Sequence, residues 1–146
     1  MVLGPVVHYL NSLENINTSN IRMRELMTGG YKEKLGPTGN HLWVDVRDIA
    51  LAHVLAMEKA EAAGKRFFIT KGNFCNREIV DIINEKFPEY RDGLPTGDAL
   101  KPGDWPAAGV HGWDNTQPIE VLGVTYRPFK ECIVDTVRSL QPLLKK

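Results

Sequence analysis

The segment Leu42–His53 constrains the fold of this chain more than any other. It opens with the apolar run Leu42-Trp43-Val44, continues through the acidic residues Asp45 and Asp48, and goes on with apolar residues at helical spacing. Asp45 is a good N-cap because its carboxylate can accept a backbone amide, and both acidic groups favour the positive end of a helix. The segment therefore predicts a short buried strand that runs directly into a helix.

The N-terminal part of the chain predicts another strand and another helix. Met1–Val7 is apolar and is interrupted by Gly4-Pro5, which breaks strands, so it predicts the end of a buried strand. Asn17-Thr18-Ser19 offers three N-cap side chains ahead of a helix, and Gly29-Gly30 ends that helix. Strands and helices therefore alternate from the start.

The middle of the chain continues this alternation. Lys65–Thr70 is the clearest predicted strand, and its run Phe67-Phe68-Ile69 suits burial on both faces. Asn76 is expected to cap a helix that closes at Pro88. An α/β fold follows from this order of elements.

A long loop and two helices make up the C-terminal part. Residues 91–114 are rich in Gly and Pro, and loops of this length in compact domains are often functional. A short helix over Thr116–Leu122 is expected to end at Gly123, in the left-handed conformation of a C-cap. Pro128 suits the first position of a last helix, which carries an apolar stripe.

Composition and charge exclude several classes of protein. The 146 residues, 42% of them hydrophobic, suffice for one domain with its own core. Because 18 basic and 18 acidic residues cancel, we expect no nucleic-acid partner and no anionic membrane surface as a partner. Cys75 and Cys132 form no CxxC pair and no Cys/His cluster, which predicts no metal site and a reduced, cytoplasmic protein.

Five blocks of the sequence carry a family resemblance. In chain order they are Met1-Val2-Leu3-Gly4-Pro5, Asn17-Thr18-Ser19, Leu42–His53, Asn76-Arg77-Glu78-Ile79 with Phe87-Pro88, and Asp114-Asn115-Thr116-Gln117. Together they resemble the C-terminal half of extended short-chain dehydrogenases, in the NAD-dependent epimerase/dehydratase superfamily. Within it they are most similar to fungal NADPH-dependent aldehyde, ketone and methylglyoxal reductases and to dihydroflavonol reductase-like proteins. Several blocks in the same order are more specific than one motif.

The resemblance implies the C-terminal part of a Rossmann-like doubly wound fold, together with a small mixed α/β substrate-binding lobe. Residues 1–72 would be late strands and helices of the nucleotide-binding fold, and residues 73–146 the lobe and the C-terminal helix, in one compact unit. The N-terminal nucleotide-binding core would be missing. The strand predicted at Lys65–Thr70 would then expose an unpaired edge, so we expect the isolated chain to self-associate or to be poorly folded.

The function implied by the resemblance is that of the substrate side of an NADPH-dependent carbonyl reductase, acting on a small aldehyde or ketone. A pyrophosphate site needs a Gly-rich turn, and the nearest candidate here, Gly36-Pro37-Thr38-Gly39, loses an amide donor at its proline. The catalytic Tyr-x-x-x-Lys would precede Met1. The chain alone is therefore expected to be inactive and to bind NADPH poorly. A non-catalytic remnant or interaction module, and a reading frame that simply starts late, are the alternatives.

One accidental match to the catalytic motif occurs near the C-terminus. Tyr126 and Lys130 satisfy Tyr-x-x-x-Lys, but Pro128 lies between them. Because proline breaks a helix anywhere beyond its first turn, Tyr126 is expected outside the helix that holds Lys130. The two side chains should not share a face, so we predict no catalytic residue in this chain.

Three site residues follow from the resemblance alone. Val2 matches the residue whose backbone lies near the nicotinamide carboxamide, and Met1 matches the adjacent residue of the substrate pocket. Ser19 matches a cofactor-binding serine near the phosphates. A hydroxyl at a helix N-terminus suits an anion, but an ordinary N-cap explains Ser19 equally well.

The remaining candidates have structural explanations. His53 is expected on the apolar side of its helix, as a packed histidine. His111 lies in the long loop, where contact with substrate and a solvated position both remain open. Cys132 fits a small core residue on the apolar stripe. Cys75 precedes the expected cap Asn76, where a helix N-terminus could lower its thiol pKa.

Overall fold

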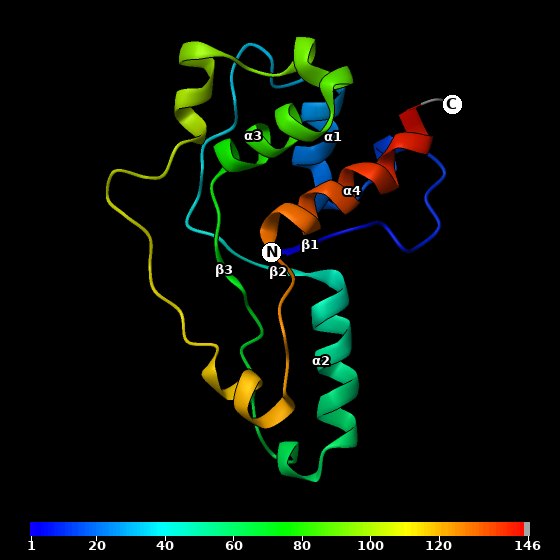
Figure 1. Cartoon of the computed structure of the whole chain (residues 1–146), viewed down its shortest axis with the longest axis vertical. Helices are drawn as coiled ribbons and strands as arrows, with labels where there is room; N and C mark the ends of the chain where they lie inside the picture. Colours follow the sequence, from blue (N-terminus) through cyan, green and yellow to red (C-terminus); the bar gives the residue numbers. More distant parts are fainter. Residues whose placement is uncertain (145–146) are drawn as a thin grey trace.

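The computed structural model describes residues 1–144 and contains a three-stranded sheet with four α-helices (Figure 1). The strands are β1 (Val2–Leu3), β2 (Leu42–Asp45) and β3 (Gly72–Asn73), in the order β1-β2-β3. β1 runs parallel to β2, with Val2 opposite Val44, and β3 runs antiparallel to β2, with Gly72 opposite Trp43. The mixed sheet confirms the α/β class.

The helices are α1 (Ile21–Thr28), α2 (Val46–Glu58), α3 (Asn76–Lys86) and α4 (Phe129–Leu144). Shorter helical turns lie at Leu13–Asn15, Thr18–Asn20, Ala60–Ala62, Pro88–Gly93, Gly97–Gly103 and Pro118–Leu122. α1, α3 and α4 gather on one side of the strands, whereas α2 extends away from them with the chain that leads to β3 (Figure 1). None of the helices in residues 1–144 combines the length and the apolar character needed to cross a membrane.

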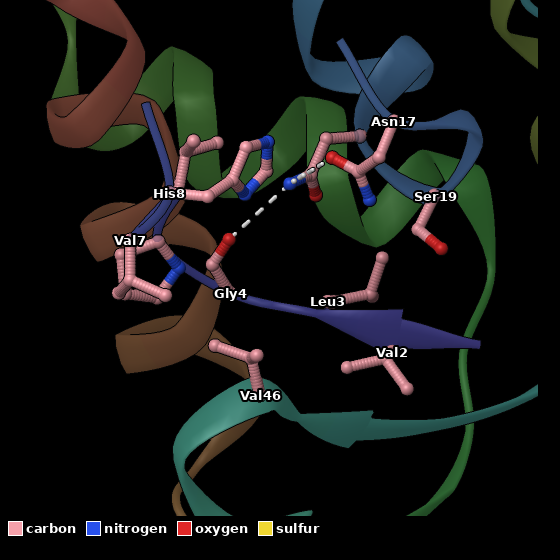
Figure 2. A pocket seen from close by; sticks show the side chains of 11 residues that line it. Val2, Leu3, Gly4, Val7, His8, Asn17, Ser19 and Val46 are labelled. Atoms are coloured by element: carbon pink, nitrogen blue, oxygen red, sulfur yellow. Dashed lines mark hydrogen bonds between the residues drawn. The ribbon is translucent and has the colours of Figure 1, made fainter. Parts of the chain in front are cut away.

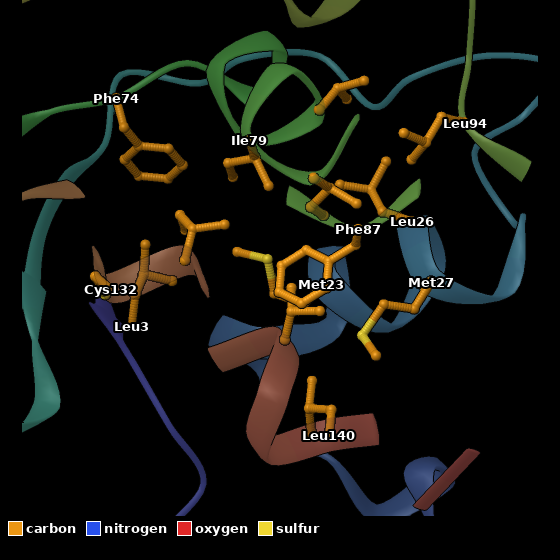
Figure 3. Close-up of a cluster of buried hydrophobic side chains, with 14 of the residues drawn as sticks. Leu3, Met23, Leu26, Met27, Phe74, Ile79, Phe87, Leu94, Cys132 and Leu140 are labelled. Atoms are coloured by element: carbon orange, nitrogen blue, oxygen red, sulfur yellow. The ribbon is translucent and has the colours of Figure 1, made fainter. Parts of the chain in front are cut away.

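The main core fills the space between α1, α3 and α4 (Figure 3). Its fully buried side chains come from both halves of the chain and include Leu3, Met23, Leu26, Ile79, Ile83, Ile133, Val137 and Leu140. A smaller cluster, made of Ala52, Ala62, Leu122 and Val124, packs under α2. The larger core packs β1 and α1 against the C-terminal helix.

The junction between β2 and α2 forms as predicted. Asp45 ends β2, caps α2 and accepts a hydrogen bond from the Arg47 amide at 2.8 Å. The C-cap glycines are also confirmed, because Gly29 and Gly123 have φ angles of 80° and 75° in the left-handed region. The last helix begins at Phe129, directly after Pro128.

The strand predicted over Lys65–Thr70 is wrong, because this segment is irregular and Phe68 is 54% exposed. The register of the sheet explains the failure. β3 pairs Gly72 with Trp43, so continuing the antiparallel ladder would place Ile69 opposite Val46. Val46 is already the first residue of α2, and a strand without a neighbour has no backbone partners. The pairing therefore stops just before the aromatic run.

The predicted cap of α3 is displaced by one residue. The N-cap is Cys75, whose amide donates to Glu78 Oε2 at 2.9 Å, and Asn76 is the first helical residue. The Asn76 side chain instead donates to the carbonyls of Gly36 and Pro37, at 2.9 and 3.0 Å. Asn76 thus anchors the preceding loop to α3 rather than capping the helix.

Candidate functional site

A small cavity lies beside β1, where the strand meets the helical turn Thr18–Asn20 (Figure 2). Its volume is about 170 Å³. The lining residues come from β1 and the segment after it, from the turn and from the start of α2, and they include Val2, Gly4, His8, Asn17, Ser19, Asn20 and Val46. The structure therefore brings Val2 of β1 and Ser19 of the helical turn to one cavity, although other residues separate them in the sequence.

The backbone of Val2 faces the open side of the sheet. The Met1 carbonyl accepts a hydrogen bond from the Val44 amide at 3.0 Å, so this residue faces β2. Because alternate residues of a strand bond to the same neighbour, the N–H and C=O of Val2 point to the other edge of β1. No strand within residues 1–144 pairs with that edge. The polar groups of Val2 are thus available to a ligand or to another strand.

Ser19 is half-buried in the wall of the cavity and does not act as an N-cap. Asn17 precedes the turn Thr18–Asn20, and Asn20 precedes α1. The N-cap residues are therefore Asn17 and Asn20, and Ser19 is not one of them. Its hydroxyl lies beside the cavity at the start of a helical segment, a placement that suits an anionic group.

Asn20 is a lining residue that the sequence did not single out. It is 3% exposed, and its Nδ2 donates to the Gly4 carbonyl at 3.3 Å and to Asn17 Oδ1 at 3.2 Å (Figure 2). Its Oδ1 is buried and has no hydrogen-bond partner among the described residues. A buried acceptor without a donor costs about 1–3 kcal/mol, so this atom favours a donor group from a ligand in the cavity.

Met1 borders two further cavities. One, of about 170 Å³, separates Met1 and Val2 from Phe68 and Ile69. The other, of about 440 Å³, lies between Met1, α1 and the loop before β2, and it is lined by Met1, Thr18, Ile21, Arg22, Tyr31, Gly36, Pro37, His41 and Asn76. Met1 therefore shares the smaller of these cavities with Val2, whereas the larger one is lined by neither Val2 nor Ser19.

Tyr126 and Lys130 do not form a catalytic pair in this structure. Lys130 Nζ binds the carboxylate of Glu85 on α3 at 2.7 and 2.8 Å. The hydroxyl of Tyr126 is buried beside the small cluster under α2, and burial raises its pKa. A tyrosine that donates a proton needs a neighbouring cation that lowers its pKa, and Lys130 is occupied elsewhere.

The other candidates divide between surface and core. His53 is exposed, with Nδ1 2.7 Å from the Ile49 carbonyl, so the prediction that it packs on the apolar side of its helix is wrong. His111 is exposed in its loop. Cys132 is fully buried, as predicted. Burial also raises the pKa of the Cys75 thiol, which overturns the idea of a lowered pKa at this helix start. Within residues 1–144 no group of His, Cys, Asp and Glu side chains could hold a metal ion.

The cavity beside β1 fits part of a dinucleotide and not the whole. Its orphaned acceptor Asn20 Oδ1 and the free backbone groups of Val2 suit a carboxamide, which has both a donor and an acceptor. Its volume of about 170 Å³ lies below the roughly 300–1,000 Å³ of ordinary ligand pockets. The residues present therefore fit the nicotinamide end of NADPH, whereas no Gly-rich turn for the pyrophosphate occurs in the sequence.

Comparison with known proteins identifies relatives along almost the whole chain, although no family model matches. The ketoreductase azaE of Aspergillus niger is 40% identical over 141 residues, which cover 96% of this chain and 41% of that protein. The NADPH-dependent methylglyoxal reductase GRE2 of Saccharomyces cerevisiae is 32% identical, over 95% of this chain and 40% of its own length.

Solved structures show the same relationship. Gre2 of Candida albicans, determined in complex with NADPH, superimposes with a TM-score of 0.75 and 27% identity, over 97% of this chain and 41% of that one. The fold described above thus corresponds to part of the Gre2 fold, as the sequence blocks implied. The chain belongs to the family of fungal NADPH-dependent reductases of the extended short-chain dehydrogenase type, and it spans 41% of the length of the ketoreductase to which it is similar.

Proposed function

We propose that this chain forms the substrate side of an NADPH-dependent carbonyl reductase, which converts a small aldehyde or ketone to an alcohol. The observation that supports this most directly is the cavity that joins Val2 and Ser19 at the open edge of β1. It occurs in a chain that is 40% identical to a ketoreductase. NADPH is the cofactor that the relatives' names and structures carry.

Each site residue has a distinct role in this proposal. Bound NADPH supplies a hydride. The backbone of Val2 and the Oδ1 atom of Asn20 hold the carboxamide, which orients the nicotinamide ring. The hydroxyl of Ser19 binds a phosphate oxygen, and the side chain of Met1 borders the carbonyl substrate. The family's tyrosine proton donor is expected outside this chain, and Tyr126 does not replace it, because its hydroxyl is buried beside the small cluster under α2.

The isolated chain is expected neither to bind NADPH appreciably nor to reduce carbonyls. Without a Gly-rich turn, several charge-assisted hydrogen bonds to the pyrophosphate are missing, each of about 1.5–3 kcal/mol. A loss of that size removes micromolar affinity. Isothermal titration calorimetry should therefore detect no low-micromolar binding.

A chimaera tests the proposal directly. The part of the Aspergillus niger ketoreductase that this chain does not match would be joined ahead of Met1. The chimaera should oxidise NADPH in the presence of small aldehydes or ketones, whereas the supplied part alone, as the control, should not. A folded chimaera that binds NADPH but reduces no carbonyl compound would refute the proposed function.

One feature favours the alternative of an interaction module. α2 and the segment beside it expose Leu51 and Val54 at 45% and 44%, Met57 at 80% and Phe68 at 54%. Exposed apolar faces of this kind often mark contacts with other proteins. An inactive chimaera whose α2 face is protected from hydrogen exchange by another protein would favour this alternative over the reductase.

A further inference from the structure

Arg22, on the first turn of α1, is a half-buried cation without an acidic partner. No carboxylate within residues 1–144 forms an ion pair with it, and its one hydrogen bond runs from Nη1 to the sulfur of Met1 at 3.1 Å. Its guanidinium carbon lies 5.7 Å from the centre of the Phe74 ring. A thioether is a weak acceptor, so the five N–H donors of this guanidinium are largely unused.

Neighbouring arginines in the same fold are paired. Arg24, two residues along α1, binds Glu25 at 2.6 Å, and Arg47 binds Asp45 at 2.8 Å. Burial lowers the pKa of Arg22, which reflects the cost of holding its charge away from water. An unpaired, partly desolvated charge is expensive, so Arg22 favours an anion that the chain itself does not provide.

The space in front of Arg22 can hold a small molecule. Its volume of about 440 Å³ falls within the roughly 300–1,000 Å³ typical of ligand pockets. The described residues that line this cavity include no acidic one. Thr18 and Tyr31 line it together with Arg22 and supply two hydroxyl groups. Met1 and Ile21 give it an apolar side. The cavity therefore combines one cation, two hydroxyls and an apolar wall.

The charge and shape of the guanidinium favour a carboxylate. His41 also lines the cavity, and burial, Arg22 and the α-ammonium of Met1 lower the pKa of this histidine. Among the described residues, Arg22 is the one arginine or lysine that lines the cavity, and its charge also acts on the α-ammonium of Met1. A carboxylate, with one charge and a planar pair of oxygens, matches one guanidinium fork, whereas a phosphate carries a charge of about −1.5 to −2.

We propose that this cavity binds the carboxylate of an oxo-acid substrate, with Arg22 as its partner and the reactive carbonyl directed toward Met1. The inference rests on the proposed function, because it names the substrate class of that same site. Arg22 is then a specificity-determining residue. When the acid binds, two charge-assisted hydrogen bonds to its carboxylate take the place of the weak contact between Arg22 and the Met1 sulfur. Carbonyl compounds without an acidic group would bind the same space less tightly.

The test compares an acid with its neutral ester on the 146-residue chain. Phenylglyoxylate and methyl phenylglyoxylate carry the same ketone and differ in charge. Titration followed by ¹H–¹⁵N NMR should show the acid binding about tenfold more tightly than the ester, as expected for a charge-assisted pair. In the wild-type protein the acid should also raise the His41 pKa, because it neutralises Arg22, and the ester should not.

Two variants locate the effect. Arg22→Gln should weaken binding of the acid about tenfold and leave binding of the ester unchanged. Arg24→Gln, the matched control, should change neither, because Arg24 is paired with Glu25 and does not line the cavity. Arg22→Lys should keep part of the preference for the acid, since it retains the charge without the planar fork.

Several outcomes would overturn the inference. Equal affinity for the acid and the ester would do so, as would an unchanged affinity of Arg22→Gln for the acid. Inorganic phosphate that displaces the acid at a lower concentration would identify a phosphate site instead. These results are separable from the proposed function, because a chimaera that reduces neutral ketones without preferring acids would keep the reductase assignment and discard the oxo-acid.

Discussion

At the scale of single residues, Asp45 joins three parts of the molecule. It is fully buried, caps α2 and binds the Arg47 guanidinium, which also reaches Asp135 on α4 at 2.7 Å. Burial pushes the pKa of Asp45 upward, but the hydrogen bonds from Arg47 outweigh it and hold the pKa below its usual value. The strand, the helix and the C-terminal helix are therefore tied together through one carboxylate.

Replacing Arg47 should be costly. Arg47→Met leaves Asp45 buried without its cation, and breaking such a pair costs about 3–5 kcal/mol when both groups are buried. Since Arg47 is 29% exposed, we expect about 2–3 kcal/mol from urea unfolding. Arg138→Met is the matched control, because its 67% exposed side chain makes a longer contact of 3.8 Å with Asp135. A loss below about 0.5 kcal/mol is expected there. Equal losses in the two variants would contradict this account.

The same pair predicts that Arg47→Met changes the pH dependence of stability. In the wild-type protein the lowered pKa of Asp45 contributes stability that is complete above about pH 4 and is lost as the pH falls further. Arg47→Met keeps the amide of residue 47 as a donor to Asp45 but removes the guanidinium, so the folded-state pKa of Asp45 should rise relative to the wild type. The loss of stability on acidification should then be smaller than in the wild type. The difference between the urea midpoints of the two proteins should therefore narrow as the pH falls from about 6 to 3. Parallel curves would argue against a shifted Asp45.

Ser19 provides the residue-scale test of the cofactor site. In the chimaera, Ser19→Ala should raise the apparent NADPH constant by about fivefold, equivalent to one lost hydrogen bond of about 1 kcal/mol. The maximal rate should change less, because the contact holds the cofactor rather than the transition state. Tyr126→Phe should leave steady-state kinetics nearly unchanged. The reverse pattern, with Tyr126→Phe inactive and Ser19→Ala normal, would make Tyr126 the active-site residue.

At the scale of secondary-structure elements, Gly123 shows why the chain turns where it does. Its φ of 75° ends the helix Pro118–Leu122 and sends Val124 into the small cluster under α2. An added Cβ would meet nothing closer than 3.7 Å, so the cost of Gly123→Ala is backbone strain of about 1–2 kcal/mol. Gly112→Ala, in open space without a positive φ, should be nearly neutral. Thermal unfolding of the two variants measures the difference, and a neutral Gly123→Ala would remove strain as the explanation.

Local chemistry predicted those elements whose ends depend on nearby residues. Asp45 and Gly123 act on atoms a few positions away, so the sequence placed them correctly. Lys65–Thr70 failed because a strand needs a neighbour, and whether β2 continues opposite it depends on where α2 begins. His53 failed for a related reason, since α2 is apolar on more sides than the fold covers, with Leu51 and Val54 exposed. Periodicity does not reveal which apolar side is left open.

The site was predictable only in part. Val2 and Ser19 came from the family resemblance, and the structure places both at one cavity. Asn20 and Arg22 were missed because the adjacent sequence does not reveal their surroundings. Within the part of the chain that the structure describes, the Oδ1 atom of Asn20 has no hydrogen-bond donor, and Arg22 has no acidic partner. Both properties arise from packing between β1, α1 and the loop before β2. Buried polar atoms without partners become visible only once distant segments meet.

At the scale of the whole molecule, the chain spans 41% of its relative's length and its sheet ends at an open strand. The N–H and C=O of Val2 face that edge, and the side chain of Val2 is 37% exposed. Edges of this kind pair readily with other strands. The outer edge of β1 is therefore available for association, whereas the irregular segment Lys65–Thr70 offers no strand edge.

We accordingly expect the isolated chain to self-associate through β1. Sedimentation velocity should show a monomer that gives way to a dimer as the concentration rises. In a two-fold pairing, Val2→Lys would place two like charges across the new strand pair, at a cost of about 0.2–1 kcal/mol, and should weaken the dimer up to about fivefold. Val7→Lys, at a 76% exposed position outside the strand, should not, because Val7 pairs with nothing along the β1 edge. A wild-type monomer at every concentration would show that the open edge of β1 is too short to recruit a second chain.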